Sequence, residues 1–283
     1  MFKFGFREDA SSIEENSEQE DRLEWIPATR LEITAEQLGA KYEADCYTET
    51  EAFPGCSLKL IRFDKVTQDL TNRNCRNVVE AESKHSDLIP GKYEGGLKIW
   101  ECTFDLGRYM LKENIELKGK LVMDLGCGAG LIGLLSIRKN ATVHFQDYNE
   151  EVLKSVTIPN VLLNSDDRTS LPTKCEFYAG DWASLATLLD DEKYDYIFTS
   201  ETIYNPENHR KLYEIFKTKL KADGAAFVAG KTYYFGVGGG MRQFENLILK
   251  DDYFDVRPMW RSQDGVNREI LKLTRKQDRT SVA

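Results

Sequence analysis

Short apolar segments alternate with longer amphipathic ones over the C-terminal two thirds of the chain, and polar or glycine-containing turns separate them. Apolar runs or period-two alternation predict strands, whereas apolar residues spaced every three or four positions predict helices. The predicted strands span 120–124, 142–147, 175–179, 194–199, 225–231, 254–259 and 269–274. The predicted helices span 104–111, 131–140, 150–163, 184–190, 206–220 and 241–251. Strand and helix therefore alternate along most of this region.

The order of these elements predicts the fold class. Five strands joined by helical crossovers form a mostly parallel sheet with helices on both faces. The last two strands are joined by the polar turn 262–265, so they form a hairpin and one of them must run antiparallel. Pro159 should disturb its helix, and Pro206 suits a first helical turn. We predict an α/β fold, a Rossmann-like seven-stranded, mostly parallel sheet with a C-terminal antiparallel hairpin, plus an N-terminal extension.

The N-terminal third differs in character from the rest. Residues 7–24 contain eight acidic and two basic residues, so they carry −6 of the formal net charge of −9. With almost no apolar side chains they cannot offset the entropy of ordering, so 1–24 are expected to be a disordered tail. In residues 25–90 short apolar groups alternate with polar turns. This pattern predicts an extension packed on the main domain, with an edge strand at 59–63. The main domain then spans 91–275, and 276–283 form a C-terminal tail.

Composition excludes several classes of protein. Outside the acidic tail the net charge is −9 minus −6, about −3, so no direct sequence-specific binding of nucleic acid is expected. No apolar run approaches the roughly 18 residues of a membrane span, and a signal peptide's apolar core is absent, so we expect an intracellular protein. The six cysteines are scattered, which predicts reduced thiols. His85, His144 and His209 lack metal-like spacing, and His144 is interpreted as structural.

A glycine loop, 126–133, follows the strand 120–124 and opens a helix, which is typical of a βαβ unit that binds a nucleotide-type cofactor. Its glycines satisfy the dinucleotide spacing, so a nicotinamide or flavin is one alternative. Asp124 closes the strand where its carboxylate would repel a pyrophosphate but would favour the ammonium and sulfonium of S-adenosylmethionine. Nineteen residues after Gly128, Asp147 occupies the place of an acid that binds ribose hydroxyls. We therefore favour S-adenosylmethionine.

Other candidate ligand contacts follow the strands, because ligands of such sheets bind beyond the carboxyl ends. Asp181 suits the exocyclic amine of an adenine and Trp182 suits its ring, although Asp181 is alternatively a helix N-cap. The glycine-containing stretch 90–103 is interpreted as a lid over the methionine end of the cofactor. The aromatic and glycine-rich stretch 233–240 is interpreted as a mobile wall over a peptide site.

Five separated motifs resemble those of the eukaryotic protein-histidine methyltransferases of the seven-β-strand class, which modify a histidine of a large-subunit ribosomal protein. The motifs are residues 90–103, the glycine loop, 146–149, 200–206 and 234–240, and the similarity covers roughly 90–274. The resemblance implies cofactor contacts at Ile99, Trp100, Glu101, Cys102, Thr103, Gly126, Gln146, Asp147, Tyr148, Gly180, Asp181, Trp182 and Ser200, beside Asp124 and Gly128 of the charge argument. It also implies a ribosomal protein partner and a location in the cytoplasm and the nucleus, including the nucleolus. We expect a monomer.

A histidine acceptor makes mild demands on a site. A lysine with a pKa of ~10.4 must first lose a proton, at a cost of about 4.6 kcal/mol at pH 7, whereas an imidazole with a pKa of ~6.5 is already mostly neutral. The site needs one ring nitrogen aligned with the methyl group and an acceptor for the other ring N–H. Glu201, Tyr204 and Asn205 are the candidate catalytic residues, with Glu201 as the expected acceptor.

Alternative roles stay open for these residues and for the chain. One alternative is that the loop with Glu201 has a purely structural role. Another is that Asn205 and Pro206 only start a helix. Physics alone does not separate histidine from lysine as the acceptor in a protein methyltransferase of this fold. A non-catalytic chaperone for a basic ribosomal protein, with the acidic tail mimicking nucleic acid, belongs to a different class.

Overall fold

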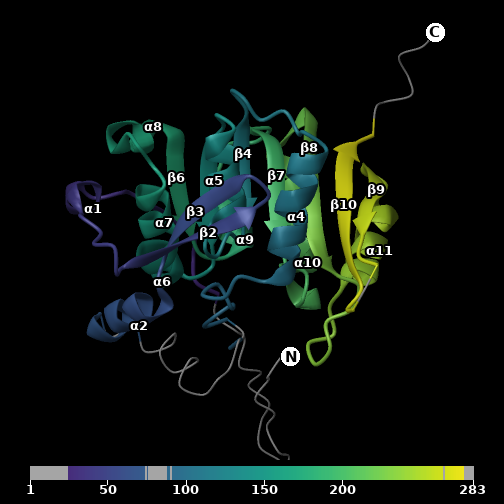
Figure 1. The fold of residues 1–283 in the computed structure, drawn as a ribbon. Coiled ribbons are helices and arrows are strands. Elements are labelled where there is room, and N and C mark those ends of the chain that lie inside the picture. The colour runs from purple at the N-terminus through teal and green to yellow at the C-terminus, as the bar shows by residue number, and fades with distance from the viewer. Residues whose placement is uncertain (1–24, 74, 76–87, 90, 264, 277–283) are drawn as a thin grey trace, which may run out of the picture.

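The computed structural model describes residues 25–73, 75, 88–89, 91–263 and 265–276. The predicted tail 1–24, His85 and residues 277–283 lie outside this part. Within it, the main feature is an eight-stranded sheet (Figure 1). Its strands in spatial order are β1 (Thr29–Leu31), β6 (Cys175–Ala179), β5 (Thr142–Asp147), β4 (Leu121–Leu125), β7 (Tyr194–Ser200), β8 (Leu220–Lys231), β10 (Arg268–Arg275) and β9 (Phe254–Arg261).

Strand directions confirm the predicted fold class. The five strands from β6 to β8 pair in parallel, and β10 pairs antiparallel with both β8 and β9. All seven predicted strands are present, and a short eighth strand was missed. That strand, β1, lies antiparallel to β6 at the sheet edge. Three largely exposed residues carry too little hydrophobic pattern to predict a strand.

Helices cover both faces of the sheet, and α4 crosses its front in Figure 1. The first face packs against α4 (Glu101–Lys112), α5 (Leu131–Arg138), α6 (Glu150–Val152) and α7 (Ile158–Leu163). The second packs against α9 (Trp182–Leu188), α10 (His209–Lys219) and α11 (Met241–Asp251). Alternation along each strand fills the two layers, since successive side chains point to opposite faces. In β4, for example, Val122 enters the first layer, whereas Met123 and Leu125 enter the second.

Two prolines shape the helices as expected. A π-helical turn, Leu153–Thr157, directly precedes α7 and breaks the predicted helix 150–163 close to Pro159, which lacks the N–H that a regular turn requires. Pro206 starts a 3₁₀ turn, Pro206–Asn208, which leads into α10. A second 3₁₀ turn, Arg168–Ser170, and α8 (Leu171–Lys174) lead into β6.

The N-terminal extension contributes a hairpin of its own. It contains α1 (Ala35–Gly39), β2 (Tyr47–Phe53), β3 (Cys56–Ile61) and α2 (Phe63–Asn72). The predicted edge strand 59–63 is wrong in detail: the strand ends at Ile61 and pairs with β2 in a separate two-stranded sheet. Its far edge is bound by side chains in α7 and at its C-cap: Ile61 N–H donates to Asn160 Oδ1 at 2.8 Å, and Lys59 N–H donates to Asn164 Oδ1 at 3.0 Å.

Buried histidines in the described region serve the packing. His144 lies in β5, its Nδ1 is 2.8 Å from the Tyr194 hydroxyl, and burial lowers its pKa. His209 Nε2 contacts the Ile203 carbonyl at 2.8 Å. No helix of the described residues has the length and apolar character that a membrane span requires.

Candidate functional site

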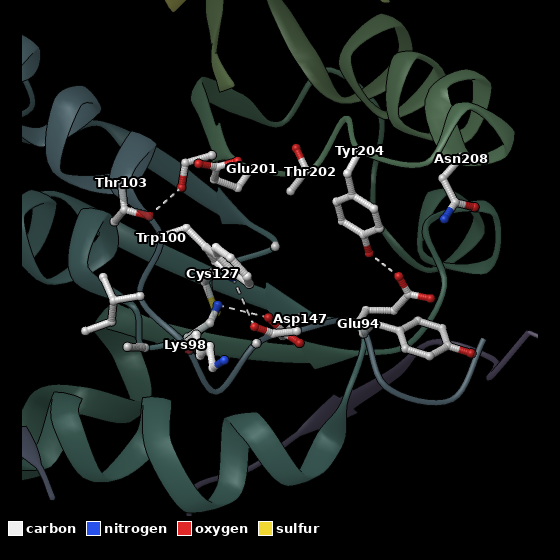
Figure 2. Close-up of a pocket in the computed structure, with 18 of the residues that line it drawn as sticks. Glu94, Lys98, Trp100, Thr103, Cys127, Asp147, Glu201, Thr202, Tyr204 and Asn208 are labelled. Carbon is white, nitrogen blue, oxygen red and sulfur yellow. Dashed lines mark hydrogen bonds between the residues drawn. The ribbon is translucent and has the colours of Figure 1, made fainter. Parts of the chain in front are cut away.

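A cavity opens beyond the carboxyl ends of β4, β5, β6 and β7, where the sequence places the ligand (Figure 2). Thirteen of the predicted site residues line it: Ile99, Trp100, Thr103, Gly126, Gly128, Asp147, Tyr148, Gly180, Asp181, Trp182, Ser200, Glu201 and Tyr204. Five others do not: Glu101, Cys102, Asp124, Gln146 and Asn205. Further lining residues that sequence reasoning missed include Trp25, Glu94, Lys98, Thr202 and Asn208.

The glycine loop forms the floor between β4 and α5. Gly126, Gly128 and Gly130 have φ angles of 68°, 50° and 77°, which side chains rarely tolerate. A Cβ on Gly128 would lie 3.0 Å from the Gly96 carbonyl oxygen, and a Cβ on Gly126 would lie 2.5 Å from Thr202 Cγ2. The loop is therefore glycine-rich because other parts of the cavity wall approach it closely.

Asp147 connects this loop to the end of β5. Its Oδ2 accepts the Gly128 N–H at 2.9 Å, and its Oδ1 accepts the Asn149 N–H at 3.2 Å. Burial raises the pKa of the Asp147 carboxyl to about 6. The side chain reaches the centre of the cavity in Figure 2. Asp147 thus places a buried acceptor where the sequence predicts the ribose hydroxyls.

Asp124 lies near the end of β4 and does not line the cavity. Its expected contact with the cofactor's positive charge stays a prediction. Its Oδ2 instead accepts the Gly133 N–H at 2.8 Å, and burial raises the pKa of its carboxyl to about 7. The first-turn amides of a helix have no intrahelical acceptor, so a carboxylate at the strand end stabilises the turn into α5.

Gln146 also acts behind the cavity wall. Its Oε1 accepts N–H groups from Trp182 Nε1 at 2.8 Å and from Gly126 at 3.2 Å, and its Nε2 donates to the Gly180 carbonyl at 2.8 Å. This one amide therefore holds residues from the ends of β4 and β6 in fixed positions. Its predicted direct contact with the cofactor stays a prediction beside this positioning role.

Asp181 is the N-cap of α9, which is the alternative role that the sequence left open. It accepts a hydrogen bond from the Ala183 N–H at 2.9 Å, and it forms an ion pair with Lys211 Nζ at 2.6 Å. It also lines the cavity, so a ligand contact is compatible with the cap. Each carboxylate oxygen already has one partner within the protein. The remaining lone pairs can still accept a hydrogen bond from an adenine amine, but the negative charge is already paired with Lys211.

The stretch 91–100 folds over the cavity through bonds to the end of β5. Tyr148 donates its hydroxyl to the Gly91 carbonyl at 2.8 Å, and Asn149 Oδ1 accepts the Glu94 N–H at 3.0 Å. Glu94 then reaches across the cavity, where its carboxylate accepts the Tyr204 hydroxyl (Figure 2). Burial raises the pKa of the Glu94 carboxyl. The sequence predicts a lid here but contains no signal that Glu94 points inward.

The start of α4 lines the other side of the cavity. Thr103 Oγ1 lies 2.9 Å from Ser200 Oγ, and both residues line the cavity. Glu101 and Cys102 point elsewhere: Glu101 pairs with Lys231 Nζ at 3.1 Å, and the Cys102 N–H approaches Glu201 Oε1 at 3.4 Å. Neither residue lines the cavity, and their predicted cofactor contacts stay predictions.

Glu201 is the buried carboxylate at the end of β7. It has a φ of 59°, an uncommon conformation for a residue with a side chain, and strain of this kind concentrates at functional sites. Its Oε2 accepts the Tyr234 hydroxyl at 2.6 Å, and Lys231 Nζ lies 3.8 Å from its Oε1. The carboxylate is therefore oriented by fixed donors at the cavity.

Asn205 does not join this group. Its Oδ1 accepts the Glu207 N–H at 3.0 Å and caps the 3₁₀ turn, as its alternative role required. Asn208, three residues further on, lines the cavity instead. Nothing in the sequence singles out Asn208, and the catalytic role of Asn205 stays a prediction.

Comparison with known proteins gives the class first. Residues 116–232, which include the glycine loop and the ends of β4 to β7, match the family described as "Methyltransferase domain". Among solved structures, a TehB-like SAM-dependent methyltransferase from Corynebacterium glutamicum is 13% identical with a TM-score of 0.46, covering 74% of this chain and 98% of that chain.

The relatives then give the family. The chain is 39% identical over 251 residues to the histidine protein methyltransferase 1 homolog of Bos taurus, covering 80% of this chain and 67% of that protein. It is 43% identical over 193 residues to the homolog of Dictyostelium discoideum, covering 68% of this chain and 61% of that protein. The chain therefore belongs to the histidine protein methyltransferase family, and it spans 61% to 67% of the length of these relatives.

Two predictions are confirmed by these findings. Family membership confirms the resemblance that the five motifs indicate. The methyltransferase match confirms S-adenosylmethionine over a dinucleotide as the cofactor. The chemistry of the cavity fits, because Asp147 and Glu94 present buried carboxylates that suit hydroxyls and positive charge and would disfavour a pyrophosphate.

Proposed function

We propose that this chain transfers a methyl group from S-adenosylmethionine to a ring nitrogen of a histidine in a protein. One observation carries the proposal: the chain belongs to the histidine protein methyltransferase family, and Asp147, which accepts the Gly128 N–H, lines the same cavity as the buried Glu201. When bound, S-adenosylmethionine supplies an electrophilic methyl group on a sulfonium.

The residues of the chain have modest tasks in such a reaction. A histidine that is mostly neutral at pH 7 needs no strong base. It needs orientation and a partner for the ring N–H that becomes more acidic as positive charge develops. Glu201 is suited to this task because its carboxylate is held by Tyr234 and lies at the cavity. Tyr204, whose hydroxyl is bound to Glu94, is suited to shaping the space between cofactor and substrate.

The stretch after β8 is suited to contact a protein substrate. Tyr234 is buried against Glu201, whereas its neighbours Tyr233 and Phe235 are 49% and 73% exposed. Their rings contact each other edge to face, with centroids 5.0 Å apart. Exposed aromatic side chains beside a reaction site are typical of recognition surfaces.

We further propose that the substrate is a large-subunit ribosomal protein, and that the chain acts as a monomer in the cytoplasm and the nucleus, including the nucleolus. The resemblance of the five motifs supports this choice, and the nearly balanced charge outside the acidic tail is compatible with a protein rather than a nucleic-acid target.

One experiment tests the activity and the substrate. The protein is incubated with methyl-labelled S-adenosylmethionine and ribosomal proteins from cells that lack the enzyme, and the labelled protein is hydrolysed for amino-acid analysis. Labelled methylhistidine from a large-subunit protein supports the proposal. Labelled methyllysine would make the chain a lysine methyltransferase. Absence of cofactor binding in calorimetry, together with tight binding of the basic protein, would indicate a chaperone.

A further inference from the structure

A segment from the far N-terminal side of the chain closes one end of the cavity. Trp25 lines the cavity although its neighbours there, Tyr148 and Asp181, lie more than a hundred residues away in the sequence. Its successor Ile26 is bound at both backbone groups: the N–H donates to the Tyr148 hydroxyl at 3.0 Å, and the carbonyl accepts the Asp181 N–H at 2.8 Å. The Ala28 N–H donates to Ser184 Oγ at 2.7 Å. We call residues 25–31 the strap.

The sheet itself holds the strap in place. Its last three residues form β1, in which Thr29 is the partner of Ala179 in β6. The chain crosses directly over Gly180, where a Cβ would lie 2.5 Å from the Pro27 carbonyl oxygen and 2.6 Å from Ala28 Cα. Gly180 has a φ of 106°. A glycine at the end of β6 is therefore required by the passage of the strap as well as by its own backbone conformation.

The indole of Trp25 is fixed by its neighbours. Tyr148 meets it edge to face, with ring centroids 5.8 Å apart and an interplanar angle of 83°. Lys211 Nζ lies 3.6 Å from the centroid of the Trp25 ring and pairs with Asp181 at 2.6 Å. A cation over the face of an indole is attracted by the negative face of the ring, so Lys211 holds the Trp25 side chain in one orientation. The ring is thus oriented by side chains of the protein itself, which lowers the entropy lost when a ligand binds.

The topology indicates which part of the cofactor meets this ring. The acid suited to the ribose, Asp147, ends β5, and the next strand outward from the glycine loop is β6, where the strap lies. A purine attached to that ribose therefore extends toward β6. Resting on the proposed function, we propose that Trp25 is a purine-binding residue of the cofactor cavity, presented by the strap and positioned by Lys211.

The test compares two ligands that share the purine and the ribose. S-Adenosylhomocysteine also carries the amino-acid end, whereas 5′-methylthioadenosine does not. Both are titrated into the full chain and its variants in a calorimeter. Trp25→Ala should raise the Kd of both ligands by the same factor, roughly tenfold, as expected for one lost aromatic contact. Lys211→Met should raise both by about threefold, since Lys211 does not line the cavity and acts by holding the Trp25 ring and Asp181 in position.

Ile26→Ala is the matched control. Ile26 belongs to the strap, its side chain is 41% exposed and does not line the cavity, and its backbone bonds survive the substitution. Both Kd values should stay within twofold of wild type. Trp25→Phe, which keeps an aromatic ring, should fall between wild type and Trp25→Ala and serves if the alanine variant does not fold.

The outcomes are separable. If Trp25→Ala and Trp25→Phe bind both ligands as tightly as wild type, the inference is overturned while the proposed function stands. A loss confined to S-adenosylhomocysteine would place Trp25 at the amino-acid end and would also overturn it. If the wild-type chain binds neither ligand, the proposed function itself fails.

Discussion

The Tyr234 hydroxyl donates to Glu201 Oε2 at 2.6 Å, and this bond joins the stretch after β8 to the end of β7 inside the cavity wall. It explains how a carboxylate in a strained backbone conformation keeps one orientation, since the Cys102 N–H approaches its other oxygen at 3.4 Å. A group held from both sides is preorganised to receive an N–H on which charge develops.

Glu201→Gln therefore separates catalysis from binding. The amide keeps the size of the side chain but weakens the interaction with an imidazolium, so transfer should slow at least tenfold, about 1.4 kcal/mol in the barrier, with an unchanged Kd for the cofactor. Single-turnover transfer and calorimetry measure the two quantities. Tyr234→Phe, which removes only the orienting hydroxyl, should slow transfer less. A normal rate in the glutamine variant would assign Glu201 a structural role.

Cofactor binding should depend on pH through Asp147. Burial raises the pKa of this carboxyl to about 6, and the ionised form is the stronger acceptor for ribose hydroxyls. Protons compete with the cofactor below that value, so the Kd should rise by up to about tenfold per pH unit below pH 6 and level off above pH 7.

The Asp147→Asn variant tests the assignment. It should bind more weakly at pH 7.5 and lose the acid-side dependence, in calorimetric titrations between pH 5 and pH 8. Asp190→Asn is a suitable control, because that carboxylate is 88% exposed and does not line the cavity. An acid-side dependence that persists in Asp147→Asn would assign the titration to another group.

The parts of this site that were predictable share a physical basis. Strands β4, β5 and β7 are buried on both faces, so their apolar runs stand out, and a βαβ topology brings their carboxyl ends together. Asp147 and Glu201 were found for this reason. Trp25 was not, because it precedes rather than belongs to a periodic segment, the strand β1 that follows it has only three largely exposed residues, and its neighbours are distant in sequence. Glu94 was missed because the direction of a side chain in a glycine-rich lid depends on tertiary contacts.

Two substitutions of Asp124 distinguish its role as a hydrogen-bond acceptor for the glycine loop from an effect of its negative charge on the cofactor. Asp124→Ala removes the acceptor of the Gly133 N–H and should weaken cofactor binding through the glycine loop, whereas Asp124→Asn keeps an acceptor and should bind almost normally. Calorimetry at pH 7.5 distinguishes the two. Equal losses in both variants would show that the carboxylate charge itself favours the cofactor.

Asp124→Asn should also change how stability depends on pH. The pKa of this carboxyl is about 7 in the folded protein and ~3.9 in an unfolded chain. Between these values the folded state keeps a proton that the unfolded state has lost, so this group's contribution to stability falls as pH rises from about 4 to about 7. Relative to wild type, the asparagine variant should gain up to about 4 kcal/mol between pH 4 and pH 8, measured by urea denaturation. A constant difference between the two proteins would contradict the buried ionisation.

Phe235 offers a test of substrate recognition that leaves the fold intact. Its ring is 73% exposed, so Phe235→Ser should change the free energy of unfolding by less than about 0.5 kcal/mol. If the ring contacts the substrate protein, the KM for that protein should rise by about fivefold to tenfold, with an unchanged Kd for the cofactor. Leu249→Ser is the matched control, since Leu249 is 52% exposed on α11 and does not line the cavity. Steady-state kinetics with the intact protein substrate measure the difference. Equal KM values for the two variants would show that the stretch after β8 does not recognise the substrate through its exposed rings.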